Sequence, residues 1–270
     1  MSRATIRGAE LAYDVAGSGP DVVLIHSTLA DRRMWDPQLP ILRGHRILRI
    51  DLRGFGGSSL PEGEFSMRAD IAELMASVGM RKALVVGSSL GGSVAIDLAI
   101  ERPDLVRGLV LIGAGIGGSD ASEELKRAVA EIDALAERGA IEEAVERELW
   151  LWVDGPARPS GTVSGPVRDY LRAADLAATR RAPEWSRVRP ARLEPPAAER
   201  LEEILAPTLV VVGEYDVPDI VAKAHELARR LPKGELVVIG DTAHFPSLER
   251  PDEFNAHLSR FMDRLERSGG

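Results

Sequence analysis

The sequence predicts an α/β protein in which a mostly parallel, twisted sheet carries helices on both faces. Short runs rich in β-branched residues alternate with segments of helical periodicity, and the runs DVVLIH, KALVVG and PTLVVVG are almost wholly apolar. Such strands are typical of a parallel sheet that is buried on both faces. With 270 residues, 44% of them hydrophobic, the chain is long enough to bury one large core.

Local signals outline the elements of the first half. A hairpin is expected through ATIRG and LAYDVAG, and the strands DVVLIH and HRILRID follow it. Ser66 and Gly79 bracket apolar residues at helical spacing, which predicts a helix that the serine caps and the glycine ends. A second helix is expected to run to about Glu101, and the strand VRGLVLIG comes after it.

The alternation of strands and helices stops in residues 117–206, where strand-like runs give way to Glu- and Ala-rich segments of helical periodicity. This stretch is interpreted as a mostly helical cap or lid, and RLEPPAAER as its return linker. The core is then expected to consist of residues 1–116 and 207–270. In the second part, the strands PTLVVVG and GELVVIG flank a helix that begins at Pro218.

Composition limits the classes of function. Cysteine is absent, so disulfides, a thiolate nucleophile and cysteine metal sites are excluded. No apolar run approaches the ~20 residues that cross a bilayer, and the N-terminus lacks the apolar segment of a signal peptide, so a soluble, cytoplasmic protein without membrane contact is expected. A formal net charge of -8 without a dense basic stripe argues against nucleic acid as a partner.

The tetrapeptide GSSL occurs twice, and only one copy has the setting of a nucleophile. The second copy completes GxSxG around Ser89, directly between a strand and a helix, whereas the first copy, around Ser59, lies in a loop and is followed by Pro61. A sharp turn lifts a serine hydroxyl clear of the sheet, and flanking glycines let strand and helix pass closely. Ser89 is therefore the predicted nucleophile, and Ser59 belongs to a turn.

A serine nucleophile needs a base, and the base needs a carboxylate to orient it. Asp216 and His244 each follow a predicted strand, in the expected chain order of serine, acid and histidine. Both should lie at the carboxyl edge of the sheet, where Ser89 emerges. Asp241 is the competing acid, but a group so near His244 in sequence seldom reaches round to its ring. The other histidines fit less well: His26, His45, His225 and His257.

The chain resembles the α/β-hydrolase fold superfamily, in the branch of small soluble serine esterases and lactonases. The resemblance rests on VVLIHSTLADRRMWDPQ, DLRGFGGS, VVGSSLGG, PTLVVVGEYD and AHFPSLERPDEF, which stand in the family's order over nearly the whole chain. Ser27 stands where family loops commonly have glycine. This serine resembles the 3-oxoadipate enol-lactonases, which also have a stretch comparable to MWDPQ. A serine at the elbow distinguishes the chain from related dehalogenases and epoxide hydrolases, which use aspartate.

The resemblance implies an oxyanion hole formed by the backbone N–H groups of Leu90 and Thr28. The expected activity is hydrolysis of a small-molecule ester or lactone through an acyl-enzyme, with no metal and no organic cofactor. Carbon–carbon bond hydrolases and perhydrolases share the serine triad, and a ligand receptor with slow turnover is an alternative of another class. The motifs carry no information on oligomeric state.

Three other patterns in the sequence each have a functional and a simpler structural interpretation. Gly113, Gly115 and Gly118 match GxGxxG after a strand, but the second strand of a dinucleotide site is not predicted to follow. The tryptophans of the insertion, Trp150, Trp152 and Trp185, are expected either to line an apolar pocket or to fill the lid's own core. The arginine cluster is interpreted as a solvated linker, with a substrate carboxylate site as the alternative; its members are Arg180, Arg181, Arg187, Arg189 and Arg192.

Overall fold

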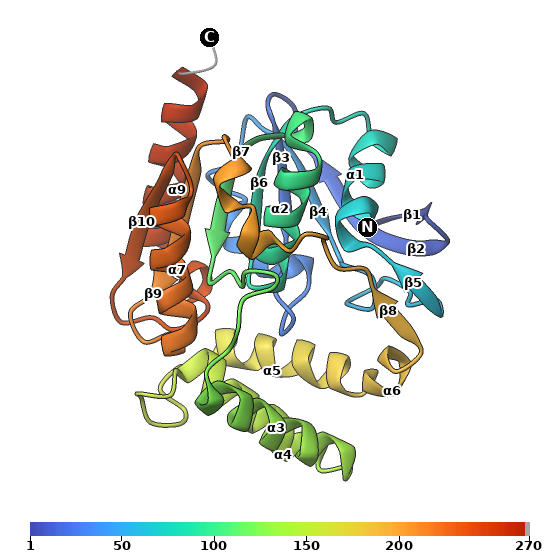
Figure 1. Ribbon diagram of the computed structural model, residues 1–270, viewed down its shortest axis with the longest axis vertical. Coiled ribbons are helices and arrows are strands. Elements are labelled where there is room, and N and C mark those ends of the chain that lie inside the picture. The colour runs from blue at the N-terminus through green and yellow to red at the C-terminus, as the bar shows by residue number, and fades with distance from the viewer. Residues whose placement is uncertain (268–270) are drawn as a thin grey trace.

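The computed structural model describes residues 1–267 and has a central sheet of eight strands in the order β1-β2-β4-β3-β6-β7-β9-β10 (Figure 1). The expected hairpin, β1 with β2, is antiparallel, as is the pairing of β2 with β4, and all later neighbours are parallel. The strands are β1 (Ser2–Ile6), β2 (Ala9–Ala16), β3 (Asp21–Ile25), β4 (Arg46–Ile50), β6 (Ala83–Ser88), β7 (Val106–Ile112), β9 (Thr208–Gly213) and β10 (Gly234–Ile239).

Helices cover both faces of this sheet because its central strands are apolar on both sides. In β3, Val23 and Ile25 pack in one core with α1, α2 and α7, while Val22 and Leu24 pack in the other with η1 and α9. This confirms the predicted α/β architecture. The helices of the core are α1 (Met67–Ser77), α2 (Leu90–Glu101), α7 (Pro218–Arg230), α8 (Pro246–Glu249) and α9 (Pro251–Arg267), with the short 3₁₀ turns η1 (Arg32–Gln38) and η2 (Pro103–Leu105). Two more 3₁₀ turns, η4 (Ala197–Glu199) and η5 (Leu201–Glu203), precede β9.

The expected helix signals are found where the sequence has them. The Ser66 hydroxyl accepts a hydrogen bond of 3.3 Å from the N–H of Ala69 at the start of α1, and the chain reverses at Gly79 with φ at +74°. Pro218 occupies the first turn of α7, where its missing N–H leaves no hydrogen bond unmade. Within residues 1–267, no helix is long and apolar enough to cross a membrane.

Four helices between β7 and β9 form a layer across one end of the sheet, at the bottom of Figure 1. They are α3 (Glu123–Glu137), α4 (Ile141–Glu148), α5 (Pro166–Thr179) and α6 (Ala182–Trp185), and a single π-helical turn, η3 (Leu149–Asp154), continues α4. The strands of the parallel part end toward this layer, which we call the lid. Its extent as a separate unit, residues 117–206, stays a prediction.

One strand falls inside the stretch where strand-like runs are missing. β8 (Val188–Pro190) pairs in parallel with β5 (Gly63–Phe65), and the N–H of Ala191 donates to the Phe65 carbonyl at 2.7 Å. A three-residue strand that ends in proline has too little alternation to be recognised by pattern. The insertion was expected to be mostly helical, and β8 is a short strand within it, where the chain returns from the lid along the core.

Candidate active site

Ser89 lies at the sharp turn between β6 and α2, with φ at 53° and ψ at -112°. Residues other than glycine seldom adopt such angles, and they persist where the surroundings hold them. Here the Ser89 N–H donates to the Ile112 carbonyl at 2.8 Å, which ties the turn to β7. The side chain makes no capping hydrogen bond to α2, so the hydroxyl is not used to complete the helix.

The glycines of GxSxG are required by the close approach of backbones. A Cβ on Gly87 would collide with the backbone of Gly91, and a Cβ on Gly91 would collide with the Ile25 carbonyl oxygen of β3. The pattern is thus a steric requirement of this strand, turn and helix, as expected from the sequence.

The first GSSL copy ties its loop to the N-terminal strands. The Ser58 hydroxyl donates to the Asp51 carbonyl at 2.7 Å and accepts from the Ala12 N–H at 2.9 Å. The Ser59 hydroxyl accepts from the Glu10 N–H at 2.9 Å. Both serines therefore fasten their loop to β2.

His244 and Asp216 form a buried pair beside Ser89. Nδ1 of His244 lies 3.0 Å and 2.9 Å from the two carboxylate oxygens of Asp216, and Oδ1 also accepts the Val217 N–H at 2.8 Å. His244 is 2% exposed and Asp216 is 4% exposed. The competing acid, Asp241, is exposed and binds Arg250 at 2.8 Å. The structure thus brings Asp216, not Asp241, to the imidazole.

Gly113, at the end of β7, forms the surface against which this pair lies. A Cβ there would lie 2.9 Å from both Cε1 and Nδ1 of His244 and 3.3 Å from Oδ2 of Asp216, and φ is +53°. In the sequence, Gly113 stands out only as part of a GxGxxG pattern. The signal that points to it is a glycine at the carboxyl end of a strand. The chain continues from this loop into α3 instead of the second strand that a dinucleotide site needs.

Glu249 orders the loop that carries His244. Its Oε1 accepts the N–H groups of the residues on either side of the histidine, Ala243 at 2.9 Å and Phe245 at 3.3 Å, and Oε2 binds Arg158 of the lid at 3.2 Å. Burial raises the pKa of this carboxyl, although these hydrogen bonds oppose the shift. Sequence reasoning missed this residue, because nothing local distinguishes it from an exposed glutamate.

A cavity of about 380 Å³ between core and lid is lined by Ser89, His244 and Thr28. Thr28 lies at a central position of a tight turn that the Ala30 N–H closes on the Ser27 carbonyl at 3.2 Å. Leu90, as the first residue of α2, has its N–H at the helix start, where no residue of the preceding turn accepts it. Thr28 thus lines the cavity together with Ser89, and Leu90 directly follows Ser89 in the chain; that their N–H groups form an oxyanion hole stays a prediction.

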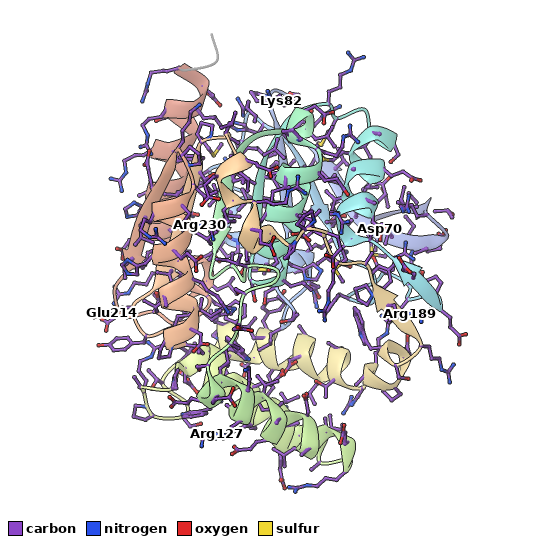
Figure 2. All side chains as sticks on the ribbon, in the orientation of Figure 1. Asp70, Lys82, Arg127, Arg189, Glu214 and Arg230 are labelled. Atoms are coloured by element: carbon purple, nitrogen blue, oxygen red, sulfur yellow. The ribbon has the colours of Figure 1, made fainter. Side chains whose placement is uncertain are left out.

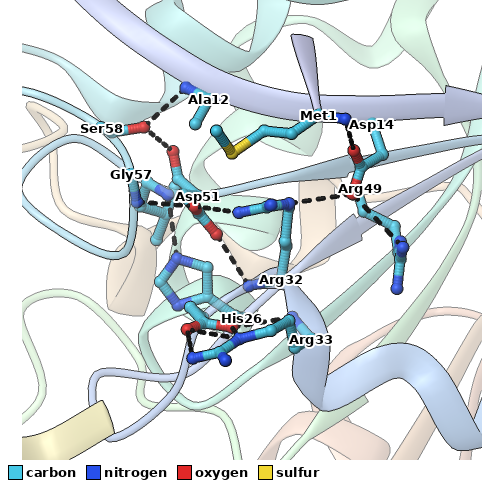
Figure 3. A network of polar contacts seen from close by, with 12 residues as sticks. Met1, Ala12, Asp14, His26, Arg32, Arg33, Arg49, Asp51, Gly57 and Ser58 are labelled. Carbon is cyan, nitrogen blue, oxygen red and sulfur yellow. Dashed lines mark hydrogen bonds and ion pairs between the residues drawn. The ribbon is translucent and has the colours of Figure 1, made fainter. Parts of the chain in front are cut away.

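Polar contacts hold His26 and Arg32, which flank the Thr28 turn in the chain (Figure 3). The Asp51 carboxylate accepts the Arg32 N–H and the Gly57 N–H, at 2.9 Å and 2.8 Å, and also binds the Arg32 guanidinium. His26 accepts the Leu52 N–H at Nε2, 2.9 Å away, and its Nδ1 lies 2.7 Å from the Ser27 carbonyl. Burial lowers the pKa of His26, which keeps it neutral in this structural role.

The tryptophans of the insertion divide between two places. Trp152 and Trp185 line the Ser89 cavity, and Trp185 also packs against Phe55 with ring centroids 5.5 Å apart. Trp150 instead lies under the guanidinium of Arg147, 4.1 Å from the ring centroid, at a different hollow. Of the two positions that the sequence allows, lining a pocket or filling the lid's own core, Trp152 and Trp185 have the first.

The arginine cluster is largely neutralised and does not line the Ser89 cavity. Arg180 pairs with Glu142 at 3.5 Å, Arg181 with Glu184 at 2.9 Å, and Arg187 with Glu62 at 3.2 Å. Arg189 is exposed on β8, at the edge of the molecule in Figure 2. The remaining member, Arg192, borders a separate hollow beside Leu90. None of these five arginines therefore lies where it could bind a substrate carboxylate in the Ser89 cavity.

Acidic side chains of the lid were not anticipated at the site. Asp133, Glu148 and Asp175 all line the Ser89 cavity, and the carboxyls of Glu148 and Asp175 interact with each other. Burial, reinforced by Glu148, raises the pKa of Asp175 to about 9, and burial also raises that of Glu148. No group of three or more acidic or histidine side chains within residues 1–267 could hold a metal ion.

Comparison with known proteins identifies the family. Residues 22–257 match the model of the alpha/beta hydrolase family. A pimeloyl-[acyl-carrier protein] methyl ester esterase from Nitrosospira multiformis is 31% identical, over 93% of this chain and 97% of that protein. A thermophilic esterase from Thermogutta terrifontis (TM-score 0.80, 98% of this chain and 99% of that one) and an N-acyl homoserine lactone degrading enzyme (0.77, 96% and 100%) are each 26% identical. The chain is a hydrolase and belongs to the alpha/beta hydrolase family.

Proposed function

We propose that the protein hydrolyses a small carboxylic ester or lactone with Ser89 as nucleophile, His244 as base and Asp216 as its orienting acid. The observation that carries this proposal is that Ser89 and His244 line one cavity, while Asp216 binds the far nitrogen of the same imidazole. A strained serine whose side chain does not cap its helix agrees with it. The similar esterase and lactone-degrading proteins act on the same chemical group.

In the proposed reaction, Nε2 of His244 takes the hydroxyl proton as the Ser89 oxygen attacks the carbonyl carbon. The tetrahedral oxyanion accepts hydrogen bonds from the N–H groups of Leu90 and Thr28. Collapse breaks the bond to the leaving alkoxide, which receives the proton from His244. Water then attacks the acyl-enzyme, His244 takes its proton, and the acid leaves as Ser89 is reprotonated. Asp216 fixes the imidazole tautomer and stabilises the imidazolium.

The test is intact-protein mass spectrometry after brief mixing with p-nitrophenyl butyrate, with nitrophenol release followed in parallel. Wild-type protein is expected to turn over and to carry a butyryl adduct transiently. The Ser89→Ala variant should lose the adduct and at least about 10⁴-fold of kcat. Ser59→Ala is the matched control, since that serine only fastens a loop to β2. Undiminished turnover by folded Ser89→Ala would overturn the assignment, and a stable adduct without turnover would favour a receptor.

A further inference from the structure

The lid contributes an acidic wall to the cavity. Asp133 comes from α3, Glu148 from the end of α4 and Asp175 from α5. These residues are far apart in sequence and meet only because the three helices pack together. Asp175 is 3% exposed, so its carboxyl lies within the protein and faces the cavity instead of bulk water.

This wall has no counter-charge among the described residues that line the cavity. None of them is lysine or arginine, and the single histidine, His244, already binds Asp216. The Asp175 Oδ1 atom has only a long hydrogen bond, 3.5 Å, from the Thr179 hydroxyl, and the buried Oδ2 atom accepts none from a described donor. Two carboxyls side by side without a cation are costly to bury. A proton shared between them, or a cation from outside, relieves that cost.

The rings nearby favour a cation as the outside partner. Trp152 and Trp185 line the same cavity, and the faces of tryptophan rings attract ammonium groups. Unpaired carboxylate oxygens accept N–H hydrogen bonds, and such charge-assisted bonds are the stronger kind. An ammonium group therefore satisfies the orphaned Oδ2 atom and the aromatic wall together.

We infer that the lid side of this cavity binds an ammonium group, so that the enzyme prefers cationic esters to neutral ones and discriminates against anionic ones. The inference rests on the proposed function and names its substrate class. The recognising groups are the carboxyls of Asp175 and Glu148, with Asp133 adding to the negative field. Ser89 and His244, which belong to the core, remain the reacting groups. The carboxyls hold the substrate by its nitrogen and take no part in the chemical step.

Three thioesters that differ only at the end of the thiol test the inference. They are S-[2-(dimethylamino)ethyl] thiobutyrate, which is cationic and carries an N–H, its neutral isostere S-(3-methylbutyl) thiobutyrate, and the anionic S-(2-carboxyethyl) thiobutyrate. The released thiol is measured with Ellman's reagent, which this cysteine-free chain does not consume. At pH 7.5 the cationic thioester is expected to have a kcat/KM about tenfold or more above that of the isostere, and the anionic one about tenfold below.

An inhibition experiment tests the case in which the ammonium group belongs to the acyl part of the natural substrate. Butylammonium should inhibit hydrolysis of the neutral thioester competitively, with an inhibition constant at least about tenfold below that of 1-butanol. Equal kcat/KM for the cationic and neutral thioesters, together with equal inhibition by butylammonium and butanol, would overturn the inference.

Variants of the two carboxyls test whether these side chains cause the preference for cationic thioesters. Asp175→Asn and Glu148→Gln keep the shapes of the side chains but replace a carboxyl, which a bound ammonium group would hold in its ionised form, with a neutral amide. The cationic-to-neutral ratio of kcat/KM should therefore fall toward one. Asp169→Asn is the control, because Asp169 is exposed on the same helix, α5, and does not line the cavity; its ratio should match wild type. If a variant fails to fold, the wild-type ratios alone decide.

The outcomes separate the two proposals. If none of the thioesters, and no p-nitrophenyl ester, is hydrolysed in a way that depends on Ser89, the proposed function fails. If the neutral thioester is hydrolysed through Ser89 without any preference for the cation, the proposed function survives. In that case the ammonium site is wrong, and the two carboxyls serve only as a proton-sharing pair within the lid.

Discussion

The carbonyl oxygen of Trp152 accepts a hydrogen bond of 3.2 Å from the backbone N–H of His244, and the indole lies 4.9 Å from the imidazole between ring centroids. Trp152 belongs to η3, the π-helical turn of the lid, whereas His244 belongs to the core. The lid thus contacts the proposed base through both backbone and side chain. We therefore expect η3 to help hold the imidazole in place.

Removing the indole should therefore disturb catalysis. Trp152→Ala keeps the carbonyl but leaves the imidazole without its neighbour, and kcat for p-nitrophenyl butyrate is expected to fall about tenfold to a hundredfold. Trp152→Phe, which keeps an aromatic ring at the position, should retain most of the rate. Steady-state kinetics on the two variants measure the difference. A wild-type kcat in folded Trp152→Ala would show that the ring only fills space.

Gly113 should not tolerate a side chain. In Gly113→Ala the new Cβ lies 2.9 Å from two ring atoms of His244 at a φ of +53°, so we expect kcat to drop at least about a hundredfold. The backbone strain should also lower the free energy of unfolding by about 1–3 kcal/mol. Gly117→Ala, in the same loop, is the control, because its Cβ would meet nothing closer than 3.7 Å. Kinetics and urea unfolding measure both effects; equal behaviour of the two variants would contradict the prediction.

The two candidate acids can be separated by matched amides. Asp216→Asn should reduce kcat about 10⁴-fold, because an amide stabilises the wrong tautomer of His244 and does not support the imidazolium. Asp241→Asn should change kcat less than about twofold, since it loses only an exposed ion pair with Arg250. The reverse ranking, in variants whose circular dichroism matches wild type, would move the acid to Asp241.

The buried acid pair should make stability depend on pH in an unusual direction. Asp175 has its pKa raised from 3.8 to about 9 by burial and by Glu148. Between these values the folded protein keeps a proton that the unfolded chain has lost, so stability is fullest below pH 3.8 and falls as pH rises toward 9. The asparagine of Asp175→Asn cannot ionise, so the free energy of unfolding of this variant should exceed that of wild type by about 1–3 kcal/mol near pH 8.

This pH effect is measured as the difference in unfolding free energy between variant and wild type at several pH values. The difference should shrink as the pH falls toward about 3, below the ordinary pKa of 3.8, where Asp175 is protonated in both the folded and the unfolded chain. Exposed Asp169→Asn should show no such trend. A difference that stays constant with pH would mean that Asp175 does not keep its proton in the folded protein.

Local sequence was enough for those parts of the molecule that local physics controls. The apolar strands, the capped helix after Ser66 and the elbow at Ser89 follow from side-chain periodicity, hydrogen-bonding capacity and glycine sterics within a few residues. Asp216 and His244 were predicted for the same reason, since each comes directly after a strand of a parallel sheet. Their carboxyl ends must meet at one edge.

Tertiary packing decided which side chains face the cavity. Glu148 and Asp175 stand 27 positions apart on two amphipathic helices, and their sequence neighbourhoods resemble those of exposed lid acids such as Asp169. Gly113 contacts His244 only after β7, β9 and the loop beyond β10 have assembled. The same assembly brings Glu249 to the backbone beside His244. A local pattern records which face of a helix is apolar, but the crossing of two helices sets which polar groups are buried together. For this reason the sequence predicts the fold and the residues of the proposed triad, while the acidic wall and its proposed ligand come from the tertiary structure alone.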